Sequence, residues 1–306
     1  MTTATKSARS LHRGAPEPVW INNILFLTDF SPVSDAALFH ALSVARRFEA
    51  KVYVTHVVEL PVAAPTAAAF YEATSVREDA ETKLNALLSE GGLNDVLHEI
   101  ILAEGSLWPA VEQIIAEKKI ELVVVGTHGR KGFRKMMLGS VAEEIYRQAH
   151  CPVLTVGPES TANPEDEMRL RRILLATDLQ DEEHRASDYA VAMAERHGAE
   201  LIVLHVIEEQ VSDFGRAEQQ RLASLARMEG LIPSDIPLAS EARMVVVRGC
   251  AADEIPGAAR TYGADLIVIG LHGGKRMAGH LPGTVAYRVV CQAPCPVLTV
   301  PAGMEE

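Results

Sequence analysis

Short apolar runs recur along the chain and alternate with longer amphipathic stretches. The runs ILFLT, VYVTHVV, LHEIIL, LVVVG and VLTV follow one another within residues 24–156. Continuous apolar runs of this length are typical of strands that are buried on both faces. Between the first two runs, residues 34–50 keep their apolar positions at helical spacing. The alternation of strand and helix predicts a parallel sheet with helices on both sides.

The whole pattern occurs twice. ILFLTDFS around Asp29 is matched by ILLATDLQ around Asp178, 149 positions later, and VYVTHVVE is matched by LIVLHVIE at the same offset. The later segments ELVVVGTHG and DLIVIGLHG are 144 positions apart. The second copy has therefore lost five residues between these anchors, and we expect the same order of elements in both copies.

The segment between the two copies has the composition of a linker. Residues 158–168 read PESTANPEDEM and are rich in Pro, small polar and acidic residues. We therefore expect one domain at residues 20–157 and a second at residues 169–302. Residues 1–19 contain no apolar run of the length that a secretory signal requires, and they are predicted to be a flexible leader.

A glycine pattern follows the fourth predicted strand of each copy. The pattern G-x2-G-x9-G-[ST] occurs at Gly126, Gly129, Gly139 and Ser140 in the first copy and at Gly270, Gly273, Gly283 and Thr284 in the second. Glycines allow backbone amides to approach an anion, and the final Ser or Thr is expected to open a helix whose first amides point outward. The pattern predicts phosphate binding. Alternatively, these residues only end strands and cap helices.

Each copy also places an aspartate at the end of its first strand, Asp29 in LTDFS and Asp178 in ATDLQ. In open α/β sheets, ligands bind beyond the carboxyl ends of the strands, near the point where the strand order reverses. A carboxylate at that place can accept a hydrogen bond from a base, or it can cap the following loop. His56 and His205 lie inside apolar strands and are interpreted as core or supporting residues rather than ligands.

Charge and composition limit the kinds of molecule that the protein is expected to bind. The chain has 29 Lys and Arg against 41 Asp and Glu, a formal charge of -12, so we expect neither nucleic acid nor an anionic membrane as a partner. No run of about 18 apolar residues occurs. Four cysteines form neither a disulfide framework nor a zinc pattern, so no metal ligands are predicted and a cytoplasmic protein is favoured.

At these residues the sequence resembles the universal stress protein family, in the tandem two-domain form of its ATP-binding branch. The resemblance covers about residues 21–301 and is carried by the two aspartates, the HVV and HVI segments, both glycine patterns and the CPVLTV endings. It implies two open parallel five-stranded sheets of the adenine nucleotide alpha-hydrolase-like, Rossmann-like class. It also implies a pseudo-dimer in which residues 153–156 pair with residues 297–300, while a homodimer of whole chains is left open.

The resemblance further implies ATP, with Mg²⁺, as the ligand of each domain. Beyond the glycine patterns, it assigns nucleotide contacts to Thr28, Asp29, Val57, Arg130 and Val141 in the first copy and to Thr177, Asp178, Val206 and Val285 in the second. The adenine would be held by the strand-end aspartate and by backbone near Val57 or Val206, and the triphosphate would lie over the glycine loop.

The expected function is that of an ATP-binding stress or signalling protein with little or no turnover. No catalytic set and no G-x4-G-K-[ST] loop is visible in the sequence. Two alternatives stay open: a slow ATPase or other ATP-using enzyme, and a scaffold in which one or both nucleotide sites are vestigial. The sequence names no protein partner.

The two copies differ around the predicted phosphate loops. The first loop contains the basic run RKGFRK, whereas the second contains GKRMAGH and has Pro282, which lacks a backbone donor, before Gly283. The second copy also carries the acidic segment DLQDEE after its first strand. These charges predict that the first domain binds ATP more tightly than the second.

Overall fold

The apolar runs become strands, and the amphipathic stretches become the helices that cover them. The computed structural model describes residues 19–59, 67–90, 92–127, 138–160, 170–180, 184–209, 213–233, 236–271 and 284–302. The first half of the chain contributes β1 (Asn23–Leu27), α1 (Pro32–Phe48), β2 (Lys51–Val58), α2 (Ala67–Glu90), β3 (His98–Glu104), α3 (Leu107–Lys118), β4 (Leu122–Gly126), α4 (Ser140–Gln148) and β5 (Val153–Val156).

The second half repeats this order of elements. It contributes β6 (Arg172–Thr177), α5 (His184–His197), β7 (Glu200–Ile207), α6 (Phe214–Glu229), β8 (Arg243–Arg248), α7 (Ala251–Tyr262), β9 (Leu266–Leu271), α8 (Val285–Gln292) and β10 (Val297–Pro301).

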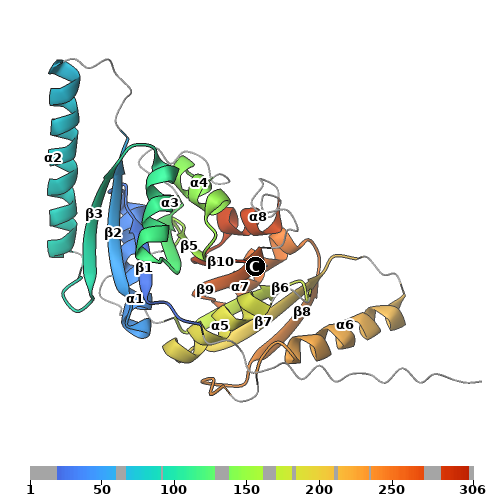
Figure 1. Cartoon of the computed structure of the whole chain (residues 1–306). Helices are drawn as coiled ribbons and strands as arrows, with labels where there is room; N and C mark the ends of the chain where they lie inside the picture. Colours follow the sequence, from blue (N-terminus) through green and yellow to red (C-terminus); the bar gives the residue numbers. More distant parts are fainter. Residues whose placement is uncertain are drawn as a thin grey trace, which may run out of the picture.

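The ten strands found among the described residues join one twisted sheet in the order β3-β2-β1-β4-β5-β10-β9-β6-β7-β8 (Figure 1). Pairing is parallel within each half, and β5 and β10 pair antiparallel where the halves meet. The predicted fold class, two parallel five-stranded sheets joined as a pseudo-dimer, is therefore confirmed.

The junction between the halves is a regular pair of buried strands. Leu154 of β5 lies opposite Leu298 of β10. The Thr155 hydroxyl donates to the Val297 carbonyl at 3.1 Å, and the Thr299 hydroxyl donates to the Val153 carbonyl at 3.2 Å. These buried hydroxyls thus find partners on the opposite strand, which satisfies polar groups that burial would otherwise penalise. The two halves form one continuous sheet.

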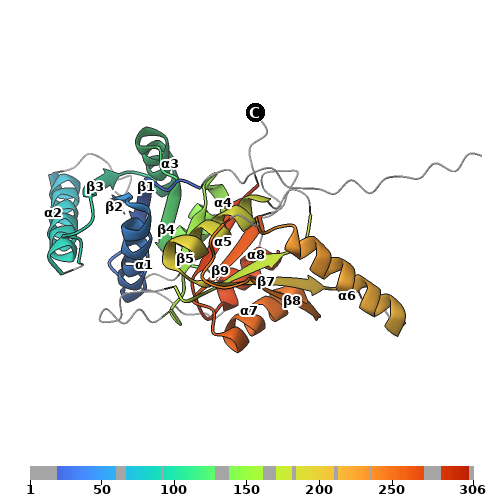
Figure 2. The same cartoon turned by 90° about the horizontal axis from the view of Figure 1, so that it is seen from below.

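Two apolar layers cover the sheet, and each layer runs through both halves. One face packs against α1 and α5 and includes Leu154 and Leu298; the other packs against α3, α4, α7 and α8 and includes Val153 and Val297. Figure 2 shows the helices on the two faces. Because successive residues of a strand point to opposite faces, the central pair of strands joins both cores across the domain boundary.

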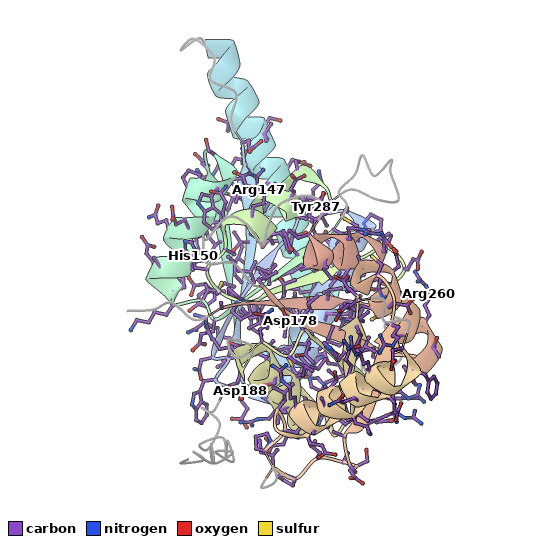
Figure 3. The ribbon with its side chains drawn as sticks, turned by 90° about the vertical axis from the view of Figure 1, so that its right-hand side faces the viewer. Arg147, His150, Asp178, Asp188, Arg260 and Tyr287 are labelled. Atoms are coloured by element: carbon purple, nitrogen blue, oxygen red, sulfur yellow. The ribbon has the colours of Figure 1, made fainter. Side chains whose placement is uncertain are left out.

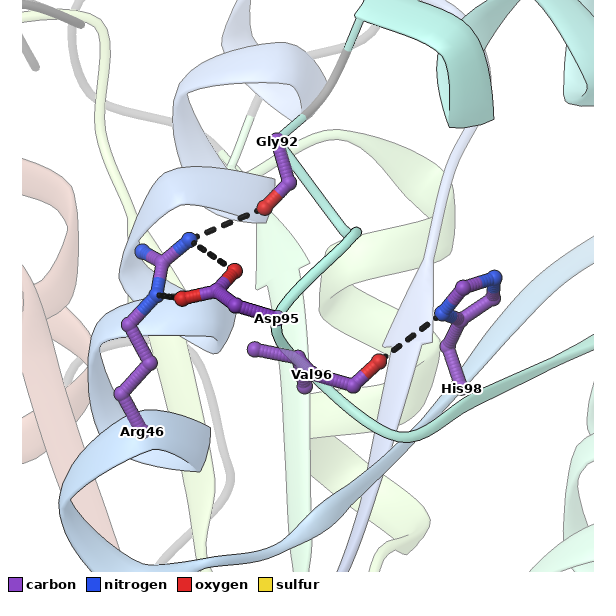
Figure 4. Close-up of polar contacts among 5 residues, drawn as sticks. All are labelled: Arg46, Gly92, Asp95, Val96 and His98. Carbon is purple, nitrogen blue, oxygen red and sulfur yellow. Dashed lines mark hydrogen bonds and ion pairs between the residues drawn. The ribbon is translucent and has the colours of Figure 1, made fainter.

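The connection from α2 to β3 is fastened to α1 (Figure 4). The Arg46 guanidinium donates to both carboxylate oxygens of Asp95, at 2.7 and 2.9 Å, and to the Gly92 carbonyl at 2.9 Å. Gly92 has a φ of +68°, a left-handed conformation that favours glycine. His98 Nδ1 contacts the Val96 carbonyl at 2.9 Å where β3 begins. These contacts fix the outer strand of the first half.

Within the described residues, no helix combines the length and the apolar character needed to span a bilayer.

Candidate functional site

The strand order reverses between β1 and β4 in the first half, and between β6 and β9 in the second. From β1 the chain moves outward to β2 and β3, then returns to β4 and β5 on the other side. The turns after β1 and β4 therefore meet at the switch point where ligands of open α/β sheets bind. Because β10 runs antiparallel to β5, the strands of the second half point the opposite way. The equivalent point of the second half therefore lies at the other end of the strands.

The turn after β1 is held by side chains. Buried Thr28 accepts the Phe30 amide at 3.0 Å through its hydroxyl oxygen, which also lies 3.1 Å from the Ser34 hydroxyl. Asp29 Oδ1 accepts the Ser31 amide at 3.0 Å. Phe30 has a φ of +60°, an uncommon conformation for a residue with a side chain. Asp29 thus caps the turn with one oxygen, as the alternative interpretation expected.

The first turn of α1 follows directly. Ser31 and Ser34 form a reciprocal capping box, and Pro32 occupies the first helical position. Asp35 lies in this first turn. Partial burial, and then repulsion from the Asp29 carboxylate, raise the pKa of Asp35 above its usual value. Two carboxylates therefore lie near one another at the end of β1.

Each half uses a histidine to support the same turn. His56 Nδ1 lies 2.7 Å from the Thr28 carbonyl, and His205 Nδ1 lies 2.9 Å from the Thr177 carbonyl. In the first half, the Phe30 ring also packs against His56, with centroids 4.5 Å apart. Both histidines act on the residue before the strand-end aspartate, so they have the supporting position that the sequence indicated.

The two ends of the first glycine pattern are joined. The Gly139 amide donates to the Thr127 carbonyl at 2.6 Å, and the Thr127 amide donates to the Val156 carbonyl at 2.8 Å. Gly139 is the N-cap of α4 and makes no side-chain cap bond, while Ser140 is the exposed first residue of the helix. The start of α4 is thus held beside the end of β4.

Gly126 has a packing role of its own. A Cβ at this position would lie 3.1 Å from Val33 Cγ1 and 3.2 Å from the Ser34 amide nitrogen, both in the first turn of α1. A glycine is therefore needed for β4 to approach α1 closely. The switch point of the first half brings together Thr28, Asp29, Gly126, Gly139 and Ser140.

The second half repeats the strand-end turn. The Thr177 hydroxyl accepts the Leu179 amide at 3.0 Å, and Asp178 Oδ1 accepts the Gln180 amide at 2.8 Å. Leu179 has a φ of +62°, equivalent to Phe30. Unlike the half-buried Asp29, Asp178 is exposed. Figure 3 labels Asp178 among the side chains.

The helix start after the second glycine pattern differs. Thr284 is the N-cap of α8, and its hydroxyl oxygen accepts the Tyr287 amide at 3.3 Å. Both Ser140 and Thr284 were expected to open a helix. Ser140 is the first residue inside its helix, whereas Thr284 caps its helix from outside, although the two positions are equivalent in sequence.

The remaining predicted contact residues lie where the topology places them. Val57 in β2 and Val206 in β7 are half-buried, and so are Val141 and Val285 in the first turns of α4 and α8. Gly270 lies in β9. Four predicted residues lie outside the described residues: Gly129, Arg130, Gly273 and Gly283. The basic loop segments, residues 181–183 of the acidic segment and Pro282, which predict unequal sites, also lie outside them.

Two groups of residues were missed by sequence reasoning. The left-handed residues Phe30 and Leu179 had no signal in the sequence, because bulky apolar residues rarely adopt this conformation. The capping box was signalled by the Ser31-Pro32 pair. Among the described residues, no group of three or more His, Cys, Asp or Glu is placed to hold a metal ion.

Comparisons with known proteins agree with this arrangement. The model of the universal stress protein family matches residues 21–157 and again residues 169–301. A universal stress protein of Methanocaldococcus jannaschii is 35% identical over 139 residues, 44% of this chain and 80% of that protein. One from Mycolicibacterium smegmatis is 28% identical over 289 residues, 90% of this chain and 96% of that protein.

Solved structures share the whole two-half fold. A universal stress protein from Archaeoglobus fulgidus superposes with a TM-score of 0.68 at 22% identity, covering 92% of this chain and 99% of that one. A structure described as a putative universal stress protein from Pseudomonas aeruginosa superposes with a TM-score of 0.63 at 20% identity, covering 92% and 94%. At these identities the likeness shows the fold.

Proposed function

The chain belongs to the universal stress protein family, and from this premise we propose that it binds ATP, accompanied by Mg²⁺, in its two domains. The protein then acts as a nucleotide-dependent stress-response or signalling protein with little or no turnover. The observation that carries the proposal is made in both halves of the chain. In each half, a strand-end aspartate lies at the switch point of the sheet beside the strand that leads into the glycine pattern.

The start of α4 supports a phosphate site in the first domain. Helix N-termini carry unpaired amides and a partial positive charge, both of which favour an anion. Gly139 contributes no side chain, and Ser140 is exposed at the first helical position. The 2.6 Å bond from Gly139 to Thr127 holds this helix start against the strand end. The triphosphate would therefore contact the backbone around Ser140 and Val141.

Recognition of the base by Asp29 is compatible with its structural bond. An ionised carboxylate offers about four acceptor positions, and the bond from Ser31 occupies one of them on Oδ1. The capping bond also fixes the carboxylate in place, which reduces the entropy that a ligand must overcome. The same reasoning applies to Asp178, whose greater exposure favours weaker recognition.

Mg²⁺ would reach the site with the nucleotide. This ion keeps several waters and is bound through phosphates with one or two carboxylates, rather than by a dedicated protein cage. Since Asp29 is assigned to the base, the phosphates themselves would supply most of the ion's ligands. When bound, the ion would neutralise part of the phosphate charge.

One specific observation favours a vestigial second site as the alternative. Thr284 uses its hydroxyl oxygen to accept the Tyr287 amide, so one of the amides at the start of α8 already has a partner. Under this alternative, the first domain binds nucleotide and the second serves as its structural partner.

Counting bound nucleotide tests the proposal. Nucleotide released by heat from freshly purified protein should be adenine nucleotide, and calorimetric titration of the stripped protein with MgATP should show binding. Ser140→Asp should weaken binding to the first domain at least tenfold, because it places a carboxylate at the phosphates. Ser140→Asn, similar in shape and neutral, is the matched control. Absence of released nucleotide together with no titration signal would overturn the proposal.

A further inference from the structure

A helix that is distant in sequence reaches the turn after β6. Helix α6 packs against β7 and β8 at the outer side of the second half (Figure 1). Its Arg227 guanidinium donates a hydrogen bond from Nη2 to the carbonyl oxygen of Leu179, 48 positions earlier in the chain. Leu179 directly follows the strand-end Asp178. A cation of the outer helix therefore contacts the backbone of the turn that carries the predicted base-binding carboxylate.

The peptide group between Leu179 and Gln180 is bonded at both ends. Its carbonyl accepts the Arg227 guanidinium, and its N–H, the Gln180 amide, donates to Asp178 Oδ1 at 2.8 Å. A peptide group is planar, so fixing its carbonyl also fixes the direction of its N–H. Bonds in such a chain polarise one another, so a cation on the carbonyl makes the N–H a better donor. Arg227 thus acts on the Asp178 carboxylate through a single peptide.

Leu179 itself needs to be held. Its φ of +62° is uncommon for a residue with a bulky side chain, and such a conformation persists where its surroundings fix it. The Leu179 amide donates to the Thr177 hydroxyl oxygen at 3.0 Å, on the strand side of the turn. Arg227 binds the carbonyl on the other side. Both backbone polar groups of the left-handed residue therefore have partners.

Helix α6 is fixed firmly enough to hold Arg227 in place. Met228, the next residue, is fully buried in the core. Arg248 at the end of β8 donates to the Ala217 carbonyl of α6 at 2.9 Å and to the Glu209 carbonyl at 3.1 Å. The helix is thus attached to the outer strand as well as to the core.

The first half has a cation at the equivalent position. Lys83 on α2 lies 144 positions before Arg227, which is the offset between the later segments of the two copies, and buried Leu84 follows it as Met228 follows Arg227. Lys83 Nζ lies 5.9 Å from the centroid of the Phe30 ring. In both halves, a cation of the outer helix therefore contacts the left-handed residue after the strand-end aspartate.

The two contacts differ in what they reach. Lys83 meets a side chain, whereas Arg227 meets the peptide that holds the aspartate. In the first half, the Ser31 amide of that peptide lies 3.0 Å from Asp29 Oδ1 and 3.1 Å from the Ser34 hydroxyl oxygen of α1. The first turn thus depends on the helix that follows it, and the second on α6.

We propose that Arg227 positions Asp178 for recognition of the nucleotide base in the second domain. The proposal rests on the proposed nucleotide binding and adds the residue that holds the base-binding carboxylate in place. Arg227 does not touch the nucleotide; it is a positioning residue. The physical basis is preorganisation, since a carboxylate that is already oriented loses less freedom when the base binds.

The first test measures the second site alone, in a protein whose first site is disabled by Ser140→Asp. Arg227→Met removes the guanidinium and keeps an unbranched stem, and in calorimetric titration it should weaken MgATP binding about fivefold, the effect of one lost hydrogen bond. Arg221→Met is the matched control, because Arg221 is an exposed arginine of the same helix that pairs with Glu218 of that helix at 2.7 Å. It should leave the affinity within about twofold.

A double-mutant cycle separates positioning from general damage to the domain. If Arg227 acts through Asp178, Arg227→Met should cost less than about twofold once Asp178→Ala has removed the carboxylate. A loss of stability or of the site as a whole would instead weaken binding equally with and without Asp178.

A second measurement needs no nucleotide, and it decides the matter where Asp178→Ala binds too weakly to titrate. Hydrogen exchange of the Gln180 amide, followed by NMR on the full chain, should become at least about threefold faster in Arg227→Met, because the bond to Asp178 is loosened. Arg221→Met should leave it unchanged.

The outcomes distinguish the two proposals. Unchanged exchange of the Gln180 amide, or equal losses of affinity with and without Asp178, would overturn the positioning role while leaving MgATP binding intact. If Ser140→Asp abolishes all MgATP binding, the second site is vestigial and the role of Arg227 falls with it. If the unaltered protein does not bind MgATP, the proposed function itself fails, and this is seen before any Arg227 variant is measured.

Discussion

The turn after β1 and the turn after β6 share one backbone course but lead into different helix starts. In the first domain, Ser31 and Ser34 form a capping box directly behind the turn, and α1 begins at Pro32. In the second domain, Gln180 occupies the place of Ser31, and α5 begins at His184. The first turn is therefore fixed by the helix that comes directly after it.

The helix starts after the glycine patterns also differ, but here it is the second domain that has the side-chain cap. Thr284 caps α8 with its side chain, whereas Gly139 gives α4 no such cap. The first domain thus combines a fixed aspartate turn with a helix start whose amides are left to other partners, as an anion site requires. The difference teaches that a duplicated domain can preserve its core and sheet while the residues at its ligand edge change roles.

Separating the domains should have the largest effect. A protein of residues 20–157 exposes the β5 edge and the apolar surface that β10 and α8 cover in the intact chain. Exposed strand edges pair with other chains. We expect this fragment to dimerise or aggregate, as judged by analytical ultracentrifugation, and residues 169–302 to behave alike. A monomer that stays soluble at high concentration would show that the domain does not need its partner strand.

Acid should destabilise the intact protein through one buried histidine in each domain. His40 on α1 and His197 on α5 are buried, and within the described structure His40 Nε2 and both His197 ring nitrogens have no hydrogen-bond partner. Burial lowers the pKa of each from 6.5 to about 4, and for His197 repulsion from Arg47 adds to this. The folded state therefore keeps both imidazoles neutral.

The free energy of unfolding should fall as the pH drops from 6.5 to about 4. Between pH 6.5 and about pH 4 the unfolded chain takes up protons that the folded chain does not. The stabilisation from the neutral histidines is therefore complete above pH 6.5 and is lost as the pH falls toward 4. Each histidine contributes at most about 3 kcal/mol to this fall. His197→Phe, the residue that the first domain has at the equivalent Phe48, should flatten the urea-unfolding profile. An unchanged pH dependence in both His197→Phe and His40→Leu would contradict the assignment.

The strands were predictable because burial on both faces leaves a strong signal. The run LVVVG became β4 and VLTV became β5, whereas the pairing of the two VLTV strands was implied by the resemblance to the family. Offsets between the copies also located the loss of five residues between β2 and β4. These features depend on hydrophobicity and order, which the sequence records directly.

The side-chain roles at the site were less predictable. Sequence equivalence suggested one role for Ser140 and Thr284, but helix starts are set by local backbone geometry, which one added side-chain bond can change. The edge-to-face contact between the rings of Tyr146 on α4 and Tyr287 on α8 was invisible to repeat comparison, because Tyr146 is equivalent to Val290 and Tyr287 to Glu143. Contacts across a pseudo-two-fold axis need the three-dimensional arrangement of both copies.

The smallest predicted effect is the ranking of the two sites. We expect Gly273→Val, which leaves the first site, to bind MgATP about five- to tenfold more tightly than Gly129→Val, which leaves the second. One unit charge near a phosphate in a partly solvated cleft is worth roughly 1 kcal/mol or more, and RKGFRK in the first loop is more basic than GKRMAGH in the second.

The acidic segment DLQDEE in the second domain acts in the same direction, and so does the Thr284 cap, which already engages the Tyr287 amide. Salt screens exposed charges and so weakens these effects. If charge sets the ranking, the ratio of the two MgATP affinities should therefore shrink as ionic strength rises. Titrations at low and at high salt measure both quantities. A ratio that is large but independent of salt would assign the ranking to the helix starts instead of the loops. Equal affinities, or a tighter second site, would remove the ranking and leave nucleotide binding itself unaffected.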